Sequence, residues 1–209
     1  MDKKIVIIGP YAAGKTSLRK FFFERVSAED VLKSPGLPTV SFRYHRYDYL
    51  YSRPFEKAGE TAEKIPTSLS VVDTSGQEIE KWYIMLKDKI FPRSDIVLFV
   101  FDVSEWDDEI KGEYIKDLIS FVIDTREELA PGSSFHVLAH KFDKIGKDGS
   151  LKEEWEQKVR SELEGYLEKK RGEATSVEVI VTSLHDAFKI ETFLSLLRIL
   201  MEAFQPVQA

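Results

Sequence analysis

The stretch of sequence that decides the fold spans residues 4–18 and reads K-I-V-I-I-G-P-Y-A-A-G-K-T-S-L. Its apolar, β-branched start predicts a buried strand over residues 4–8. Residues 9–16 match the pattern G-x-x-x-x-G-K-[ST], and an amphipathic helix is expected over residues 16–25. A strand, a glycine-rich loop and a helix N-terminus in this order present backbone N–H groups and a lysine to phosphate oxygens. The stretch therefore predicts a phosphate-binding loop.

Beyond this loop, short β-branched or aromatic runs alternate with longer amphipathic segments, which is typical of an α/β sheet. Strands are predicted over residues 4–8, 42–51, 69–73, 96–103, 135–140 and 177–182, and helices over residues 16–25, 79–91, 112–129, 151–171 and 188–204. The strand over residues 42–51 mixes charged and aromatic residues, which favours an edge position with one face in water. The pattern thus predicts a three-layer α/β fold with a six-stranded, mostly parallel sheet, one antiparallel edge strand and about five helices.

The last predicted helix has the most regular apolar pattern in the chain. Apolar residues recur at spacings of three and four and form one stripe: Ile190, Phe193, Leu194, Leu197, Leu200, Met201 and Phe204. Such a stripe normally packs on a sheet, so we expect these residues in the core.

Composition excludes several classes of protein. The 209 residues contain no cysteine, so a disulfide framework, a thiolate metal site and a cysteine nucleophile are excluded. The formal net charge is −6 and no basic tract stands out, which argues against a nucleic-acid partner. The longest apolar run, residues 96–101, is far shorter than the roughly 18 residues of a membrane helix. We expect one cytoplasmic domain over residues 1–209 with no direct membrane anchor.

Three further motifs follow predicted strands. Residues 73–77 read D-T-S-G-Q, residues 140–143 read H-K-F-D, and residues 182–184 read T-S-L. Together with the phosphate loop they resemble the motifs of the Ras-like small GTPases, across nearly the whole chain. His140 stands where most of that superfamily has asparagine, and H-K-x-D is typical of the Rag/Gtr branch, while A-A-G-K-T in the loop is also similar to the Arf branch.

The resemblance implies a P-loop NTPase fold of the Ras-like type and a role for each matching residue. Mg²⁺ is expected at Thr16, Thr39 and Asp73, and catalysis of GTP hydrolysis at Gln77, Lys15 and Thr39. The residues expected to bind GTP or GDP are Gly9, Tyr11, Ala12, Ala13, Gly14, Lys15, Thr16, Ser17, Gly76, His140, Lys141, Asp143, Ser183 and Leu184. Asp143 is the residue expected to select guanine, because adenine would leave a buried acceptor unpaired at a cost of about 1–3 kcal/mol.

Four positions keep two interpretations each. His140 either shapes the base pocket or is an ordinary core histidine, and Thr39 either reaches Mg²⁺ or simply starts a strand, with Ser34 or Ser41 as substitutes. Tyr11 either crowds the γ-phosphate and slows hydrolysis or points outward. The long polar insertion over residues 52–66 either recognises a partner or is a tolerated loop.

The function expected from these motifs is a molecular switch that binds GTP or GDP with Mg²⁺ and hydrolyses GTP slowly. Its switch segments, about residues 28–40 and 74–89, would order on the γ-phosphate and recruit GTPase-activating and effector proteins. Roadblock/longin-type partners and a dimer stay open. The resemblance favours a compact, prokaryotic-type G protein, and we expect it to lack the C-terminal dimerisation domain of Rag proteins. The alternatives are a P-loop kinase or ATPase and a GTP-dependent interaction module that does not hydrolyse.

Overall fold

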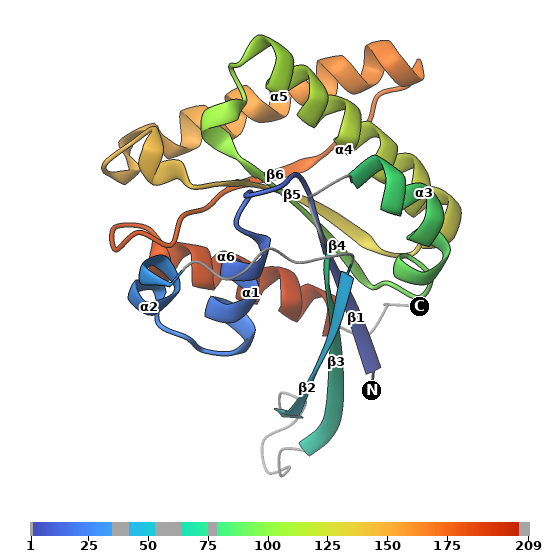
Figure 1. Ribbon diagram of the computed structural model, residues 1–209, viewed down its shortest axis with the longest axis vertical. Helices are drawn as coiled ribbons and strands as arrows, with labels where there is room; N and C mark the ends of the chain where they lie inside the picture. Colours follow the sequence, from blue (N-terminus) through green and yellow to red (C-terminus); the bar gives the residue numbers. More distant parts are fainter. Residues whose placement is uncertain (1, 35–41, 53–63, 75–78, 205–209) are drawn as a thin grey trace, which may run out of the picture.

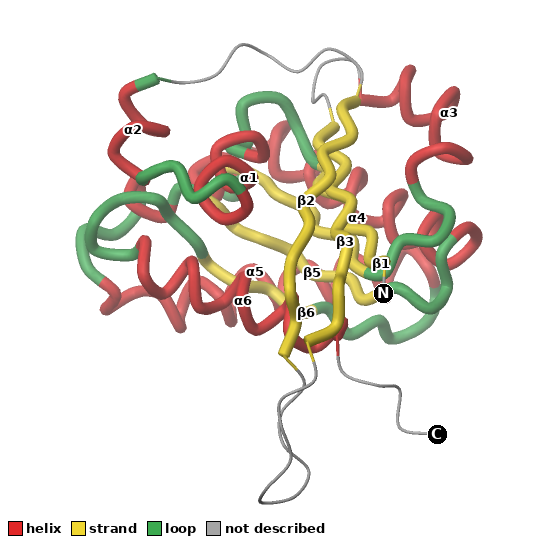
Figure 2. Tube along the Cα trace, turned by 90° about the horizontal axis from the view of Figure 1, so that it is seen from below, coloured by secondary structure: helices red, strands yellow, loops and turns green. Residues whose placement is uncertain are grey.

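The structure is a computed structural model of the 209-residue chain, and it describes residues 2–34, 42–52, 64–74 and 79–204. Within these residues one sheet has six strands in the order β2-β3-β1-β4-β5-β6. The strands are β1 (Asp2–Ile8), β2 (Phe42–Ser52), β3 (Lys64–Thr74), β4 (Ile96–Asp102), β5 (Ser134–His140) and β6 (Glu178–Val181). Only the pair β2–β3 is antiparallel, and Figure 2 shows these two strands side by side along one edge. The predicted sheet and its antiparallel edge strand are confirmed.

Helices cover both faces of this sheet and make three layers (Figure 1). They are α1 (Lys15–Phe23), α2 (Ala28–Lys33), α3 (Ile79–Ile90), α4 (Glu109–Leu129), α5 (Lys152–Arg171) and α6 (Lys189–Phe204), with 3₁₀ turns η1 (Val103–Glu105), η2 (Phe142–Lys144) and η3 (Gly149–Leu151). Alternate residues of β1 divide between the two layers. Val6 and Ile8 pack with α3, α4 and α5, and Ile5 and Ile7 pack with α1, α2 and α6. Strands buried on both faces explain the continuous apolar runs in the sequence.

The described residues contain six α-helices instead of the expected five. The additional helix is α2, only six residues long, which lies in a segment expected to be an irregular switch. Ser27 caps it, since its hydroxyl accepts a hydrogen bond from the Asp30 N–H at 3.1 Å. Serine followed three residues later by an acidic residue is a helix-start signal in the sequence, and it identifies α2 in retrospect.

The strand β3 begins at Lys64, five residues before the predicted start at Leu69. Pro66 argued against a strand here because proline cannot donate to a ladder. In this part of β3, however, the described residues place only β2 beside it, with Pro66 opposite Leu50, and pairing with β1 begins at Ser68. The proline thus stands where the sheet is two strands wide. Residues 53–63, the centre of the predicted insertion, lie outside the described residues.

The expectation for the last helix was largely wrong. In α6 the buried residues are Thr192, Leu196, Ile199 and Phe204, of which only Phe204 belongs to the predicted stripe. Leu200 is partly buried, whereas five stripe residues are exposed to solvent: Ile190, Phe193, Leu194, Leu197 and Met201. The helix is apolar on two faces, and periodicity alone could not tell which face meets the sheet.

None of the helices in the described part of the chain has both the length and the apolar character needed to cross a bilayer.

Candidate functional site

The phosphate loop links β1 to α1, and its glycines are required by geometry. A Cβ atom on Gly9 would lie 1.9 Å from the carbonyl oxygen of Val100, and Gly9 has a φ of +145°. A Cβ on Gly14, at φ +97°, would lie 2.5 Å from Cδ2 of His140. Ala12 also has a positive φ of 59°. The loop therefore lies directly against β4 and against the first residue of the H-K-F-D motif, which only glycine allows.

Lys15 is buried at the start of α1. Its Nζ donates hydrogen bonds to the carbonyl oxygens of Gly9, at 2.8 Å, and Pro10, at 2.6 Å. Burial removes water from the ammonium group and lowers its pKa to about 8, although the nearby Asp73 acts in the opposite direction. A buried cation held by backbone oxygens is suited to an anionic ligand, because phosphate would restore the stabilisation that burial removes.

Thr16 and Asp73 meet beside Lys15. The Thr16 hydroxyl donates to Oδ2 of Asp73 at 2.8 Å, and Asp73, near the end of β3, is only 1% exposed. Its other oxygen, Oδ1, is buried and has no hydrogen-bond partner among the described residues. A buried carboxylate oxygen without a partner is costly, so this pair fits a bound cation or its water shell. No three His, Cys, Asp or Glu residues gather as metal ligands in the described ranges.

Arg19 was not among the residues singled out from the sequence. It lies one helical turn after Thr16 and is buried, and its Nε donates to Oδ2 of Asp73 at 3.2 Å. Its Nη1 donates to the Tyr47 hydroxyl at 2.9 Å and to the Glu24 carboxylate. Arg19 thus connects the candidate metal site to the edge strand β2. The available sequence signal was its spacing of three from Thr16, which places both side chains on the same side of α1.

At the base end, His140 is buried between the phosphate loop and the loop after β6. Its Nδ1 lies 3.0 Å from the Thr182 hydroxyl, and its ring fills the space beside Gly14. Burial lowers the pKa of His140 to about 4, so the ring is neutral at pH 7. The histidine is a core residue and at the same time a contact between two of the candidate nucleotide-binding loops.

Lys141 has a φ of 64° and its side chain extends back over the phosphate loop. Its Nζ donates to the Ala12 carbonyl at 2.5 Å and to Asp102 Oδ2 at 3.0 Å. Asp102, at the end of β4, also accepts from Lys144 and from Ser104. Burial alone would raise the pKa of Asp102, but the hydrogen bonds from Lys144, Ser104 and Lys141 lower it to about 2. Asp102 therefore stays ionised and positions Lys141, a role that no sequence motif indicated.

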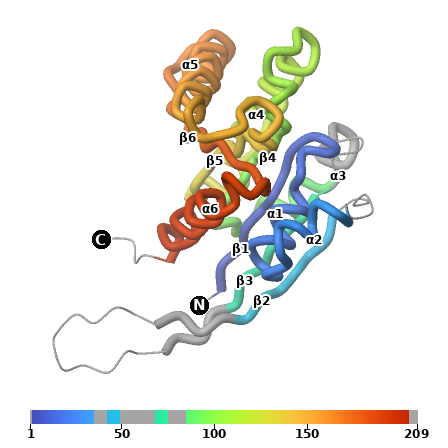
Figure 3. Tube along the Cα trace, turned by 90° about the vertical axis from the view of Figure 1, so that its left-hand side faces the viewer, coloured from blue at the N-terminus to red at the C-terminus, as the bar shows by residue number. Residues whose placement is uncertain are grey.

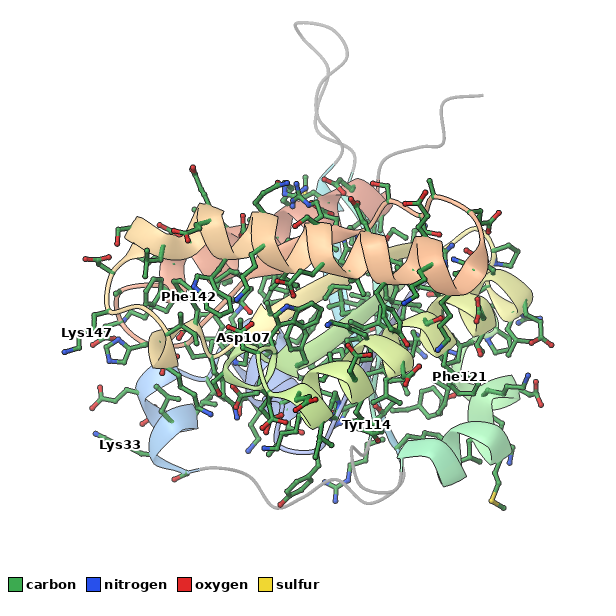
Figure 4. All side chains as sticks on the ribbon, turned by 90° about the horizontal axis from the view of Figure 1, so that it is seen from above. Lys33, Asp107, Tyr114, Phe121, Phe142 and Lys147 are labelled. Carbon is green, nitrogen blue, oxygen red and sulfur yellow. The ribbon has the colours of Figure 1, made fainter. Side chains whose placement is uncertain are left out.

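Asp143 and the loop after β6 are joined by a hydrogen bond from the Ser183 hydroxyl to Asp143 Oδ1. The Ser183 N–H donates to the Thr192 hydroxyl at 3.0 Å, so it is not available to a ligand. The next N–H, that of Leu184, has no hydrogen-bond partner among the described residues. Figure 4 shows Phe142 and Lys147, which flank Asp143 in sequence, at the end of the molecule where α5 begins.

The structure describes only some of the expected site residues. Thr39, Gly76 and Gln77 lie outside the described residues, as do Ser41 and residues 35–41 in general. Tyr11 is described and its ring is 55% exposed, while Ala13 is buried and Ser17 is partly buried. The described part of the site brings together Lys15, Thr16 and Asp73 at one end and His140, Lys141, Asp143, Ser183 and Leu184 at the other.

Comparison with known families gives one match over almost the whole chain. The model of the Gtr1/RagA G protein conserved region matches residues 4–208. The chain belongs to this family. The Rag/Gtr-type reading of the H-K-F-D motif is thereby confirmed, and the observed sheet is that of a P-loop G domain.

Individual relatives of this Gtr1/RagA family member are distant. GTP-binding protein GTR1 of Saccharomyces cerevisiae is 25% identical over 150 residues, which is 70% of this chain and 41% of the yeast protein. Ras-related GTP-binding protein B of Rattus norvegicus is 23% identical over 164 residues, 71% of this chain and 42% of the rat protein. Ras-related GTP-binding protein A of Dictyostelium discoideum is 24% identical over 166 residues, which is 77% of this chain and 48% of the Dictyostelium protein. The chain thus spans less than half the length of these relatives.

Proposed function

We propose that this chain is a GTP-binding molecular switch of the cytoplasm that binds GTP and GDP with Mg²⁺ and hydrolyses GTP slowly. The observation that carries the proposal is the buried Asp73 oxygen, which has no hydrogen-bond partner in the described part of the chain and lies next to the Thr16 hydroxyl and the buried Lys15. A cation and a polyphosphate together satisfy all three groups. The names of the relatives describe GTP-binding proteins, which supports the choice of nucleotide.

At the phosphate end, Lys15 would exchange its two backbone carbonyl partners for the β- and γ-phosphates. Thr16, Asp73 and, by family resemblance, Thr39 would hold Mg²⁺, which neutralises phosphate charge. Backbone N–H groups of Ala12 to Ser17 would surround the phosphates, since the loop joins the N-terminus of α1.

At the base end, Asp143 would accept from the ring N–H and the amino group of guanine. Ser183 holds this carboxylate in place, and the Leu184 N–H is a donor for the guanine oxygen. Lys141 would lie along the base and ribose, as Asp102 fixes its ammonium group against Ala12. His140 would support the pocket through its contacts with Thr182 and the phosphate loop.

For hydrolysis, the resemblance assigns water orientation to Gln77 and γ-phosphate contacts to Gly76. The single G domain over residues 1–209 would act through its switch segments on activating and effector proteins. Roadblock/longin-type partners belong to this proposal only as family-level candidates.

Two measurements test the proposal. Purified chain, stripped of nucleotide, should bind GDP and GTP in the presence of Mg²⁺, and excess ATP should not displace them. Equal competition by ATP would favour a P-loop kinase or ATPase. Single-turnover assays then separate a slow GTPase from a binding module, in which bound GTP would persist unchanged.

Tyr11 offers a more specific test of the hydrolysis step. A ring beside the γ-phosphate would crowd Gln77, so Tyr11→Gly should speed single-turnover GTP hydrolysis several-fold. Because the ring is 55% exposed, the substitution leaves the core intact, and GDP affinity serves as the control. An unchanged rate would assign Tyr11 to the surface.

A further inference from the structure

The proposed function does not use the exposed apolar stripe of α6. We define the α6 stripe as Ile190, Phe193, Leu194, Leu197 and Met201, which are 68%, 38%, 56%, 37% and 43% exposed. They recur at spacings of three and four over three helical turns, so they form one continuous band. Single exposed apolar residues need no explanation, but a contiguous band marks an interaction site.

Apart from Phe193, the stripe residues are not those that attach the helix to the domain. Thr192, Leu196 and Ile199 on the opposite face are buried and hold α6 to the sheet. Phe193 packs against Phe22 and Phe21 of α1, with ring centroids 5.2 Å and 6.2 Å apart. The stripe is therefore anchored on a rigid element, and Figure 3 shows α6 running along the outside of the molecule next to α1.

Two exposed charges flank the stripe on one side. Glu191 and Arg198 are seven residues apart, which is nearly two helical turns, so they lie on the same flank about 10 Å apart along the axis. Their order along the helix matters. When two copies of such a helix pack antiparallel, the glutamate of each lies beside the arginine of the other, on the same side of the pair.

We propose that the α6 stripe packs against the α6 stripe of a second copy of this chain, in an antiparallel pair with two-fold symmetry. The symmetry axis passes between Leu194 and Leu197, so Leu194 of each copy meets Leu197 of the other at the centre. Ile190 then lies beside Met201 of the other copy at each end. Glu191 and Arg198 form two equivalent ion pairs across the interface. The same surface serves both partners, as a two-fold interface requires.

The size of the stripe sets the strength of this pair. Three turns of helix span about 16 Å, so the contact is smaller than the roughly 800 Å² per partner of a standard stable interface. We therefore expect a weak, concentration-dependent dimer. Exposed ion pairs contribute about 0–1 kcal/mol each, so the charges fix the antiparallel direction more than they add affinity. The proposal does not rest on the proposed GTP-binding function.

Sedimentation of the full chain over a concentration series tests the pairing, and we expect a reversible monomer–dimer equilibrium. Leu194→Glu, which puts a charge at the centre of the interface, should abolish the dimer. Ile110→Glu is the matched control, since Ile110 is an 81% exposed apolar residue on α4, and it should leave the equilibrium unchanged. A chain that stays monomeric at all concentrations, or a dimer that survives Leu194→Glu, would overturn the proposal.

A charge exchange tests the antiparallel geometry. Glu191→Arg alone and Arg198→Glu alone each place like charges opposite each other twice, so each should weaken self-association about tenfold. An equimolar mixture of the two variants should restore the dimer as a mixed pair, because both contacts become opposite in charge again. Within one chain Glu191 also pairs with Lys152, and Arg198 with Glu178 and Glu202. Damage to these contacts would persist in the mixture, so recovery of the dimer in the mixture can come only from contacts between the two chains. Failure of the mixture to associate contradicts the antiparallel pair.

Discussion

The phosphate end and the base end of the candidate site differ in how completely the protein satisfies its own charges. At the phosphate end, the partners of Lys15 among the described residues are neutral carbonyl oxygens, and Asp73 keeps a buried oxygen without a described partner. At the base end, Asp143 accepts from Ser183, and Asp102 pairs with Lys141 and Lys144. One end is incomplete without a ligand, and the other is already assembled.

This difference assigns separate tasks to the two ends. Groups with unsatisfied charge gain most when an anion and a cation arrive, so affinity should come mainly from the phosphate end. Groups already held by hydrogen bonds reorganise little, so the base end is suited to selecting one base over another. Each of the following predictions changes one residue at one of the two ends.

The largest effect is expected from Lys15→Ala. Removing the cation leaves the phosphates without their buried partner, which typically costs about 2–5 kcal/mol, and GDP affinity should fall at least about 30-fold. Burial lowers the pKa of Lys15, so the charged ammonium group destabilises the folded chain when no ligand is bound. The ligand-free variant should therefore unfold at the same or a higher denaturant concentration. Calorimetric titration and urea unfolding measure the two quantities. Equal loss of both would mean that Lys15 is structural.

The second prediction concerns His140 and acid. Its pKa is lowered from 6.5 to about 4 in the folded chain, so the unfolded chain binds the proton more readily. Stability should therefore fall as the pH drops from about 6.5 to about 4, by ~3 kcal/mol for this group. In His140→Asn this part of the pH dependence should disappear from urea unfolding series. An unaltered pH profile would contradict the assignment of a neutral, buried ring.

The third prediction concerns which base the site selects. In Asp143→Asn the side chain offers an amide donor where the carboxylate accepted, which suits the carbonyl of xanthine in place of the amino group of guanine. GTP affinity should fall by about 1–3 kcal/mol, roughly 5- to 150-fold, while affinity for xanthosine triphosphate rises. Phosphate contacts are unchanged, so Mg²⁺ dependence serves as the control. Parallel loss for both nucleotides would place Asp143 outside the base pocket.

The smallest effect tests whether the edge strand β2 helps to hold the metal site. Tyr47→Phe removes the hydroxyl that fixes Arg19 behind Asp73 but keeps the ring that stacks on Phe23. The Mg²⁺ concentration that slows GDP release should rise about fivefold, as for loss of one hydrogen bond of ~1 kcal/mol. Tyr44→Phe, whose hydroxyl bonds to the Lys89 carbonyl instead, is the matched control and should not change it. Equal shifts in both variants would remove Arg19 from the metal site.

The sequence pattern predicted the features that depend on local spacing and missed the features that depend on packing between helices and strands. The phosphate loop and the strands that carry the motifs were predicted within a few residues, because buried parallel strands and glycine-rich loops leave strong local signals. The helix α2 was missed because it is one turn and a half long and buries only Ala28 and Val31. The orientation of α6 was wrong because both of its faces are apolar.

The site residues divide in the same way. Lys15, Thr16, Asp73 and Asp143 stand in motifs whose spacing is fixed by the loop they form, so sequence alone identified them. Arg19 acts on Asp73 and Asp102 acts on Lys141 from other elements, through contacts 54 and 39 positions apart along the chain. No local pattern contains such a contact.

By itself, the sequence determined that this chain has a phosphate-binding loop in an α/β sheet, because the loop needs glycine and lysine at fixed spacings next to a strand. It also determined the Rag/Gtr-type motif through His140. Only the tertiary structure decided that His140 is enclosed by Gly14 and Thr182, that Asp73 has one oxygen without a partner in the described ranges, and that the α6 stripe faces solvent. The physical reason is that burial and pairing are properties of elements brought together by the fold, and a residue's neighbours in sequence do not specify them.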